Sequence, residues 1–169
     1  MTFERAFALT CDAEGGYSNH PKDRGGITYK GVTQRTFSAW LAANNEDDRD
    51  VITMTDAEHK TLAYVGYWKR AHCEDCPERV GCFHFDASYN HGPALAVRLL
   101  QEALGVEIDG VYGPETNNAL GLIDDLATLD AYFEARRMLY CRIVAHDPSQ
   151  AVFLDGWNNR IRKLSDALK

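Results

Sequence analysis

Two carboxylates and one hydroxyl near the start of the chain are the residues whose types and spacing could do chemistry. Glu14 precedes two glycines, Asp23 follows nine residues later, and Thr28 lies five residues beyond Asp23. Cleavage of a glycosidic bond requires one carboxylic acid that protonates the leaving oxygen and a second carboxylate that activates water or stabilises the cationic sugar. Glu14 would act as the acid if partial burial raised its pKa, while Asp23 stayed ionised. Thr28 would then hold the attacking water.

The same residues also have a purely structural interpretation. A Glu before two glycines is typical of a helix end, as at Glu14, and an Asp shortly before Gly-Gly, as at Asp23, is typical of a turn. On spacing alone the structural interpretation is the more common one. The catalytic hypothesis therefore depends on the surrounding sequence.

The elements expected to position these residues are a helix and a hairpin. Phe3, Phe7 and Cys11 recur at helical spacing, and a glycine pair follows them, so Glu14 falls at the end of the predicted helix. Residues 15–32 contain five glycines among aromatic and β-branched residues, which favours a turn-rich hairpin. The hairpin would carry the second carboxylate and the hydroxyl.

The rest of the chain is expected to be helical, from its capping residues and apolar periodicity. Predicted helices begin after Thr33 and after Thr55 (the latter to about 68), and run over about 80–90, 93–105, 126–145 and 158–168, with a short helix opened by Pro114. No low-complexity linker or internal repeat divides the chain. The sequence therefore predicts a mainly α fold in a single compact helical unit, with a small β-hairpin near residues 16–32.

Charge and hydropathy exclude some classes of function. The formal net charge is −7 and no stripe of Lys and Arg is present, which argues against nucleic acid as a partner. No stretch approaches the roughly 18 to 20 apolar residues of a membrane span, so we expect no membrane insertion. Residues 1–12 lack the apolar region of a secretory signal, which predicts a protein made in the cytoplasm. We expect it to be a monomer.

Five cysteines raise the question of a metal site, since Cys73-x-x-Cys76 and Cys82-x-His84 lie close together. A Cys-x-x-Cys pair can present two thiolates to zinc, but the second half of the segment lacks the usual spacing. We therefore expect reduced thiols, no metal and no cofactor.

The string EGGYSNHPKDRGGITYKGVT resembles the N-terminal signature of glycoside hydrolase family 108, a family of N-acetylmuramidases in the lysozyme-like superfamily. The resemblance implies that Glu14 is the catalytic acid. The order Glu, Asp, Thr is also similar to that of phage-type lysozymes, which implies that Asp23 and Thr28 position the water that attacks the anomeric carbon. The gap between Asp23 and Thr28 is one residue shorter than in phage-type lysozymes.

Downstream segments resemble the same family. The string FDASYNHG at residues 85–92 is similar to the family's FDxAVNxG segment, which implies that Asn90 faces the cleft, while Tyr89 replaces the usual small apolar residue. Residues 100–116 resemble a peptidoglycan-binding motif, and residues 148–160 fit the pattern near the family's end.

The resemblance implies a lysozyme-like fold with two parts in the same compact unit. Residues 1–90 would form the catalytic part, and residues 91–169 a helical part of the peptidoglycan-binding type. The residues expected to contact the substrate are Tyr17, Asn19, Gly26 and Asn90.

The expected reaction is hydrolysis of the β-1,4 bond between N-acetylmuramic acid and N-acetylglucosamine in peptidoglycan glycan strands. Two alternatives stay open: a lytic transglycosylase in which Glu14 alone acts as acid and base, and a non-catalytic wall-binding or secretion-assisting protein. The absence of a signal sequence suits a phage or prophage endolysin that a holin pore releases to the periplasm. It suits a gene-transfer-agent lysin equally well.

Overall fold

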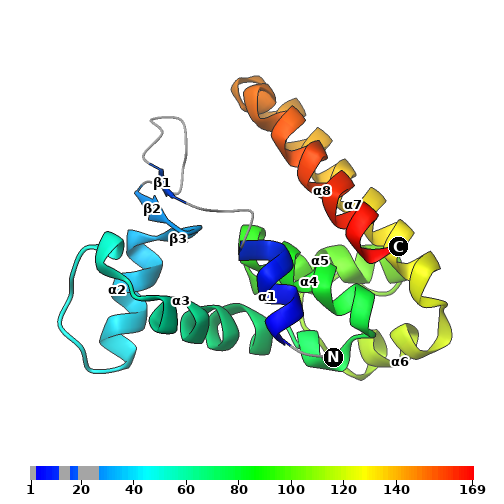
Figure 1. Cartoon of the computed structure of the whole chain (residues 1–169). Coiled ribbons are helices and arrows are strands. Elements are labelled where there is room, and N and C mark those ends of the chain that lie inside the picture. The colour runs from blue at the N-terminus through cyan, green and yellow to red at the C-terminus, as the bar shows by residue number, and fades with distance from the viewer. Residues whose placement is uncertain (1–2, 12–15, 19–26) are drawn as a thin grey trace.

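A computed structural model describes residues 3–11, 16–18 and 27–169, and helices dominate these parts of the chain (Figure 1). The helices are α1 (Phe3–Cys11), α2 (Gln34–Ala43), α3 (Asp56–Ala63), α4 (Glu78–His91), α5 (Pro93–Leu104), α6 (Pro114–Leu122), α7 (Asp125–His146) and α8 (Leu154–Leu168). Shorter helical turns are η1 (Val51–Thr53), η2 (Tyr64–Lys69), η3 (Cys73–Asp75) and η4 (Pro148–Phe153). The mainly α prediction is confirmed.

The predicted hairpin is part of a small antiparallel sheet in the order β1-β2-β3. Its strands are β1 (Tyr17–Ser18), β2 (Thr28–Tyr29) and β3 (Val32–Thr33). The turn between β2 and β3 places Lys30 and Gly31 at φ 51° and φ 78°. A Cβ at Gly31 would lie 2.7 Å from Cε1 of Tyr89, so only glycine fits this turn against α4.

The sheet and α2 lie at one side of the molecule, and α3 with η2 connects them to the body formed by α1, α4, α5 and α6 (Figure 1). Helix α4 is the centre of this body, because it packs against α1, α5 and α7 and its residues from Val80 to Tyr89 are all buried. Helices α7 and α8 lie side by side and project from the body (Figure 1).

Local sequence signals account for most helix boundaries. The Thr33 side chain accepts from the backbone N–H of Thr36 and caps α2, while Thr55 and Glu58 form a capping box at α3. Gly105 follows the last residue of α5 in the left-handed conformation, at the predicted end of this helix.

The helix predicted after Thr55 to about residue 68 is α-helical to Ala63 and continues as a π-helical turn over η2, which ends at Lys69. One predicted boundary is wrong. The last helix begins at Leu154 instead of residue 158, because Asp147 caps η4 and that turn leads directly into α8. None of the described helices is both long and apolar enough to cross a membrane.

Candidate active site

The structure describes only part of the expected site. Four of its residues lie outside the described ranges: Glu14, Asn19, Asp23 and Gly26. Tyr17 lies on β1 with its Cα opposite that of Tyr29. Thr28 lies on β2 opposite Ser18 and Thr33, and its side chain is half-buried. Asn90 lies near the end of α4 and is exposed.

The turn that follows Thr28 is attached to the helical body by polar contacts. The hydroxyl of Tyr89 donates to the carbonyl oxygen of Lys30 at 2.6 Å, and Nε2 of His59 lies 2.7 Å from the same hydroxyl. Because the Tyr89 hydroxyl donates its one proton to the Lys30 carbonyl oxygen, it accepts from His59, and Nε2–H of His59 is the donor. The Lys30 ammonium also pairs with the Asp56 carboxylate at the start of α3. These contacts, which we call the Lys30 anchor, hold β2 against α3 and α4.

His59 is neutral at neutral pH. Burial lowers its pKa to about 4, and the nearby positive charge of Lys30 acts in the same direction. The residue is 4% exposed and its ring packs against Phe7 of α1 with 5.1 Å between centroids. The anchor therefore contacts the helix that leads towards Glu14 as well as the sheet.

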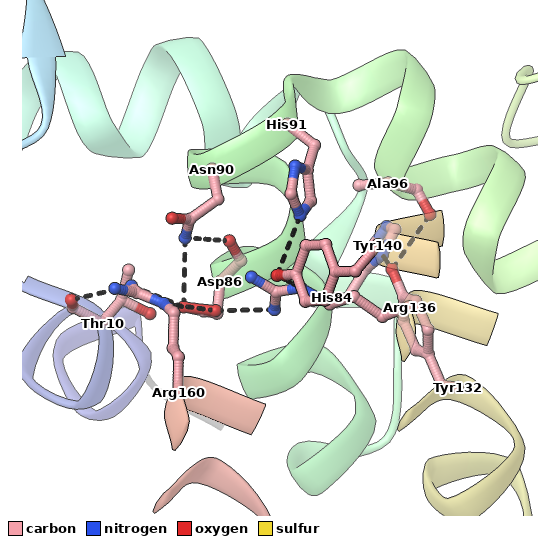
Figure 2. Close-up of polar contacts among 10 residues, drawn as sticks. All are labelled: Thr10, His84, Asp86, Asn90, His91, Ala96, Tyr132, Arg136, Tyr140 and Arg160. Carbon is pink, nitrogen blue, oxygen red and sulfur yellow. Dashed lines mark hydrogen bonds and ion pairs between the residues drawn. The ribbon is translucent and has the colours of Figure 1, made fainter. Parts of the chain in front are cut away.

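A buried carboxylate is the centre of a second group of polar contacts (Figure 2). Asp86 on α4 is completely buried between Arg136 of α7, whose Nη1 lies 2.7 Å from Oδ1, and Arg160 of α8, whose Nε lies 2.8 Å from Oδ2. Burial opposes ionisation of Asp86, but the charges of the two arginines outweigh it and lower its pKa below the ordinary value. We call these three residues the Asp86 network.

The Asp86 network reaches the end of α1. Nη2 of Arg160 donates to the carbonyl oxygen of Thr10 at 3.2 Å, in the last turn of that helix (Figure 2). The last carbonyls of a helix have no partner within the helix, so an arginine there is favourable both as donor and as charge. Thr10 precedes Glu14 by four residues. The network thus fixes the helix end from which the expected catalytic segment starts.

Asn90 is oriented by the same carboxylate. Its Nδ2 donates to the backbone oxygen of Asp86 at 2.8 Å and lies 3.3 Å from Oδ2. Its carboxamide oxygen points away from Asp86 (Figure 2). Asn90 therefore presents an acceptor away from the network, in an orientation suitable for a substrate hydroxyl or amide.

A neutral histidine extends the network. Nε of Arg136 donates to the Tyr140 hydroxyl at 2.8 Å, and that hydroxyl lies 3.4 Å from Nε2 of His91 (Figure 2). Burial, followed by the charge of Arg136, lowers the pKa of His91 to about 3. His91 therefore adds no further positive charge beside the two arginines at neutral pH.

The sequence interpretation did not select Asp86, Arg136 or Arg160 as site residues, although it included two of them in family segments. The sequence did contain one signal for Asp86. Its two neighbours in the predicted helix, Phe85 and Ala87, are apolar. A carboxylate in such a run is buried only if it is paired, so a cationic partner could have been expected.

The Cys73-x-x-Cys76 segment was the sequence's candidate for a metal site. Burial raises the pKa of Cys76 to about 12, which disfavours the thiolate that zinc needs. In the described ranges, no three His, Cys, Asp or Glu side chains are grouped so that they could hold a metal ion.

Comparisons with known proteins give two family models and similar solved structures. Residues 7–92 match the family model described as glycosyl hydrolase 108, and residues 95–162 match one described as a predicted peptidoglycan domain. Among the solved structures, that of Brucella abortus SagA is similar, with a TM-score of 0.85 and 28% sequence identity. The similarity covers 98% of this chain and 92% of that chain. No curated protein gives a significant match.

Proposed function

Because this chain belongs to the glycosyl hydrolase 108 family, we propose that it hydrolyses the β-1,4 bond between N-acetylmuramic acid and N-acetylglucosamine in peptidoglycan. One observation carries the proposal: the matched region, residues 7–92, contains Glu14, Asp23 and Thr28, which supply the acid, the second carboxylate and a hydroxyl for glycosidic bond cleavage. The similarity of residues 95–162 to a peptidoglycan domain supports the same substrate.

Glu14 acts as the general acid and protonates the glycosidic oxygen as the bond to the anomeric carbon breaks. Asp23 stays ionised and, with Thr28, orients water or stabilises the oxocarbenium-like transition state. The water oxygen forms a bond to the anomeric carbon, and one of the two carboxylates, Glu14 or Asp23, accepts the proton of the water. Tyr17, Asn19, Gly26 and Asn90 contact the sugar chain.

Two features of the described residues support this assignment of roles. The Lys30 anchor fixes β2, which carries Thr28, and the Asp86 network fixes the end of α1, which leads to Glu14. A site of this kind needs its acid and its water-positioning group held within a fraction of an ångström, and rigid supports provide that.

For the chain as a whole, we propose a catalytic part over residues 1–90 and a peptidoglycan-binding part over residues 91–169. The protein acts as a monomeric endolysin-type enzyme that reaches the wall from the cytoplasm through a holin pore. Expression with and without a co-expressed holin tests this route, since lysis without any pore would contradict it.

The test of the proposed function compares the wild type with Glu14→Gln on purified peptidoglycan and on permeabilised Gram-negative cells. The wild type should release reducing ends and clear the suspension. Glu14→Gln keeps the shape of the side chain but loses the acid, so its rate should fall by about 10²- to 10⁴-fold. Equal activity of the two proteins would overturn the catalytic role.

A further inference from the structure

A groove of about 450 Å³ lies between α2 and the helix formed by α3 and η2, and Pro93 at the start of α5 also lines it. We call it the α2–α3 groove. Two aromatic side chains, Trp40 and Tyr67, and two arginines, Arg35 and Arg70, line it as well. It therefore combines apolar walls with positive charge.

Among the residues that the structure describes, the two arginines have no partner of opposite charge. Arg35 and Arg70 are both exposed, and neither forms an ion pair with any residue in the described ranges. No Asp or Glu is among the described residues that line the groove. In a chain with a formal net charge of −7, a groove with two unpaired guanidinium groups is complementary to a ligand that carries carboxylates.

The groove lies close along the structure to two of the three described residues of the expected site, Thr28 and Asn90. Thr36, which also lines it, has its hydroxyl 2.9 Å from that of Thr33, and Thr33 pairs with Thr28 across the sheet. Pro93, another lining residue, follows Asn90 by three residues. A ligand in the groove would therefore extend from the place where the glycan strand is expected to lie.

The aromatic wall is fixed by its own contacts. The ring of Tyr67 packs on that of Tyr89 with 4.9 Å between centroids, and the Tyr67 backbone oxygen accepts from the Ser88 hydroxyl at 3.1 Å. Trp40 stacks on Phe37 with 6.1 Å between centroids. The apolar surface is thus available without rearrangement, which reduces the cost of binding.

We propose that the α2–α3 groove binds the acidic stem peptide of peptidoglycan, with Arg35 and Arg70 pairing with its carboxylates and with Trp40 and Tyr67 packing against its alkyl side chains. This inference rests on the proposed function and names the part of the substrate that the groove binds, the stem peptide. Within a strand, the acetylated sugars carry no free charge once the muramic acid carboxyl is joined to the peptide. The stem peptide is the part of the polymer with free carboxylates, and guanidinium groups bind carboxylates in a forked geometry.

The test compares two substrates, glycan strands with stem peptides and the same strands stripped of them by an amidase. The wild type should show a lower KM on the peptide-bearing strands, and added salt should weaken this preference. The double variant Arg35→Gln/Arg70→Gln should raise KM on the peptide-bearing strands by about 3- to 10-fold, as expected for two exposed ion pairs. The difference in KM between the two substrates should then disappear.

Arg162→Gln is the matched control, since Arg162 is an exposed arginine of α8 that donates only to Asn159 among the described residues. It removes one positive charge far along the chain from the groove and should keep the wild-type preference. Equal KM of the wild type on both substrates would overturn the inference. So would an equal rise in KM for the control and the double variant.

A binding measurement separates this inference from the proposed function. Calorimetric titration with a soluble disaccharide-tetrapeptide needs no turnover, and the double variant should bind it about 3- to 10-fold more weakly than the wild type. If the wild type cuts neither substrate, the proposed function fails while this titration still decides the inference. Unchanged affinity in the double variant, or no binding by the wild type, would overturn it.

Discussion

The Lys30 anchor and the Asp86 network hold two regions of the molecule, the small sheet and the end of α1, by different kinds of interaction. The Lys30 anchor joins a two-residue strand to the body through one tyrosine, one histidine and an exposed carboxylate. The Asp86 network is a carboxylate of 0% exposure between two arginines, and it connects three helices and the end of α1.

The difference indicates which property each region controls. A buried carboxylate between arginines leaves an uncompensated charge when it is removed, so the whole fold depends on it. The anchor contributes hydrogen bonds at the edge of the molecule, so its loss should alter the position of the sheet more than global stability. The predictions below test this contrast, starting with the largest effect.

Acid should weaken both regions together. Burial lowers the pKa of His59 and His84 to about 4 and of His91 to about 3, against 6.5 for an ordinary histidine. The unfolded chain therefore binds more protons, and the stability present above pH 6.5 is lost as the pH falls towards the folded-state values. Each histidine should contribute about 1.4 kcal/mol per pH unit to this loss. Urea unfolding at pH 7, 6 and 5 measures the slope.

His59→Gln separates the two regions in that experiment. It removes the titrating group of the Lys30 anchor and leaves His91 in place beside the Asp86 network. The slope of unfolding free energy against pH should therefore decrease by about 1.4 kcal/mol per unit between pH 6 and pH 5. An unchanged slope would contradict the assignment of a neutral, buried His59.

Asp86→Asn should produce the largest effect of any single substitution. It leaves Arg136 and Arg160 without a counter-charge, and breaking a buried pair in this way costs about 3–5 kcal/mol of unfolding free energy. Chemical denaturation followed by circular dichroism measures the loss. Asp124→Ala is the control, since Asp124 caps α7 at the surface and its removal should cost about 1 kcal/mol. Equal losses would refute the distinction between buried and exposed carboxylates.

Tyr89→Phe should have a smaller effect on stability and a clear effect on activity. The change leaves the His59 ring nitrogen and the Lys30 carbonyl without their partner, at a cost of about 1–3 kcal/mol. Since the strand with Thr28 loses its attachment, kcat on peptidoglycan should fall by more than the small change in melting temperature explains.

Tyr64→Phe provides the comparison for Tyr89→Phe. Tyr64 is 38% exposed, and its hydroxyl forms no hydrogen bond with any residue that the structure describes. The variant should keep both kcat and melting temperature. A Tyr89→Phe enzyme as active as Tyr64→Phe would show that the Lys30 anchor does not position the site.

The smallest effect is expected from an exposed ion pair. Arg142 on α7 makes two contacts of 3.1 Å to the Glu102 carboxylate on α5, and half of the arginine side chain is exposed. Glu102→Gln should change the unfolding free energy by less than about 1 kcal/mol. A loss as large as that of Asp86→Asn would mean that burial does not set the difference between these carboxylates.

Local signals in the sequence predicted the local parts of the fold. Thr33, Thr55 and Pro93 mark helix starts and Gly105 marks a helix end, because capping depends on residues within a few positions of each other. The third strand was not predicted, since two-residue strands are too short to show alternation. Phe153, Trp157 and Ile161 recur at helical spacing in the sequence, but of these three only Ile161 is fully buried.

The contacts that hold the site were not predictable in the same way. Arg136 and Arg160 lie 50 and 74 residues after Asp86, and nothing in one sequence shows which distant residues meet. Tyr89 stands where the family pattern has a small apolar residue. In the structure its hydroxyl donates a hydrogen bond to the Lys30 carbonyl oxygen. The roles of Glu14 and Asp23 remain predictions from the sequence.

The most direct test of the central claim is digestion of peptidoglycan in water labelled with heavy oxygen, with immediate reduction and mass spectrometry of the products. The wild type should yield muramic acid ends that carry one heavy oxygen atom, because water attacks the anomeric carbon, and Glu14→Gln should yield almost no product. Unlabelled 1,6-anhydro-muramic acid ends would instead show a lytic transglycosylase and contradict hydrolysis.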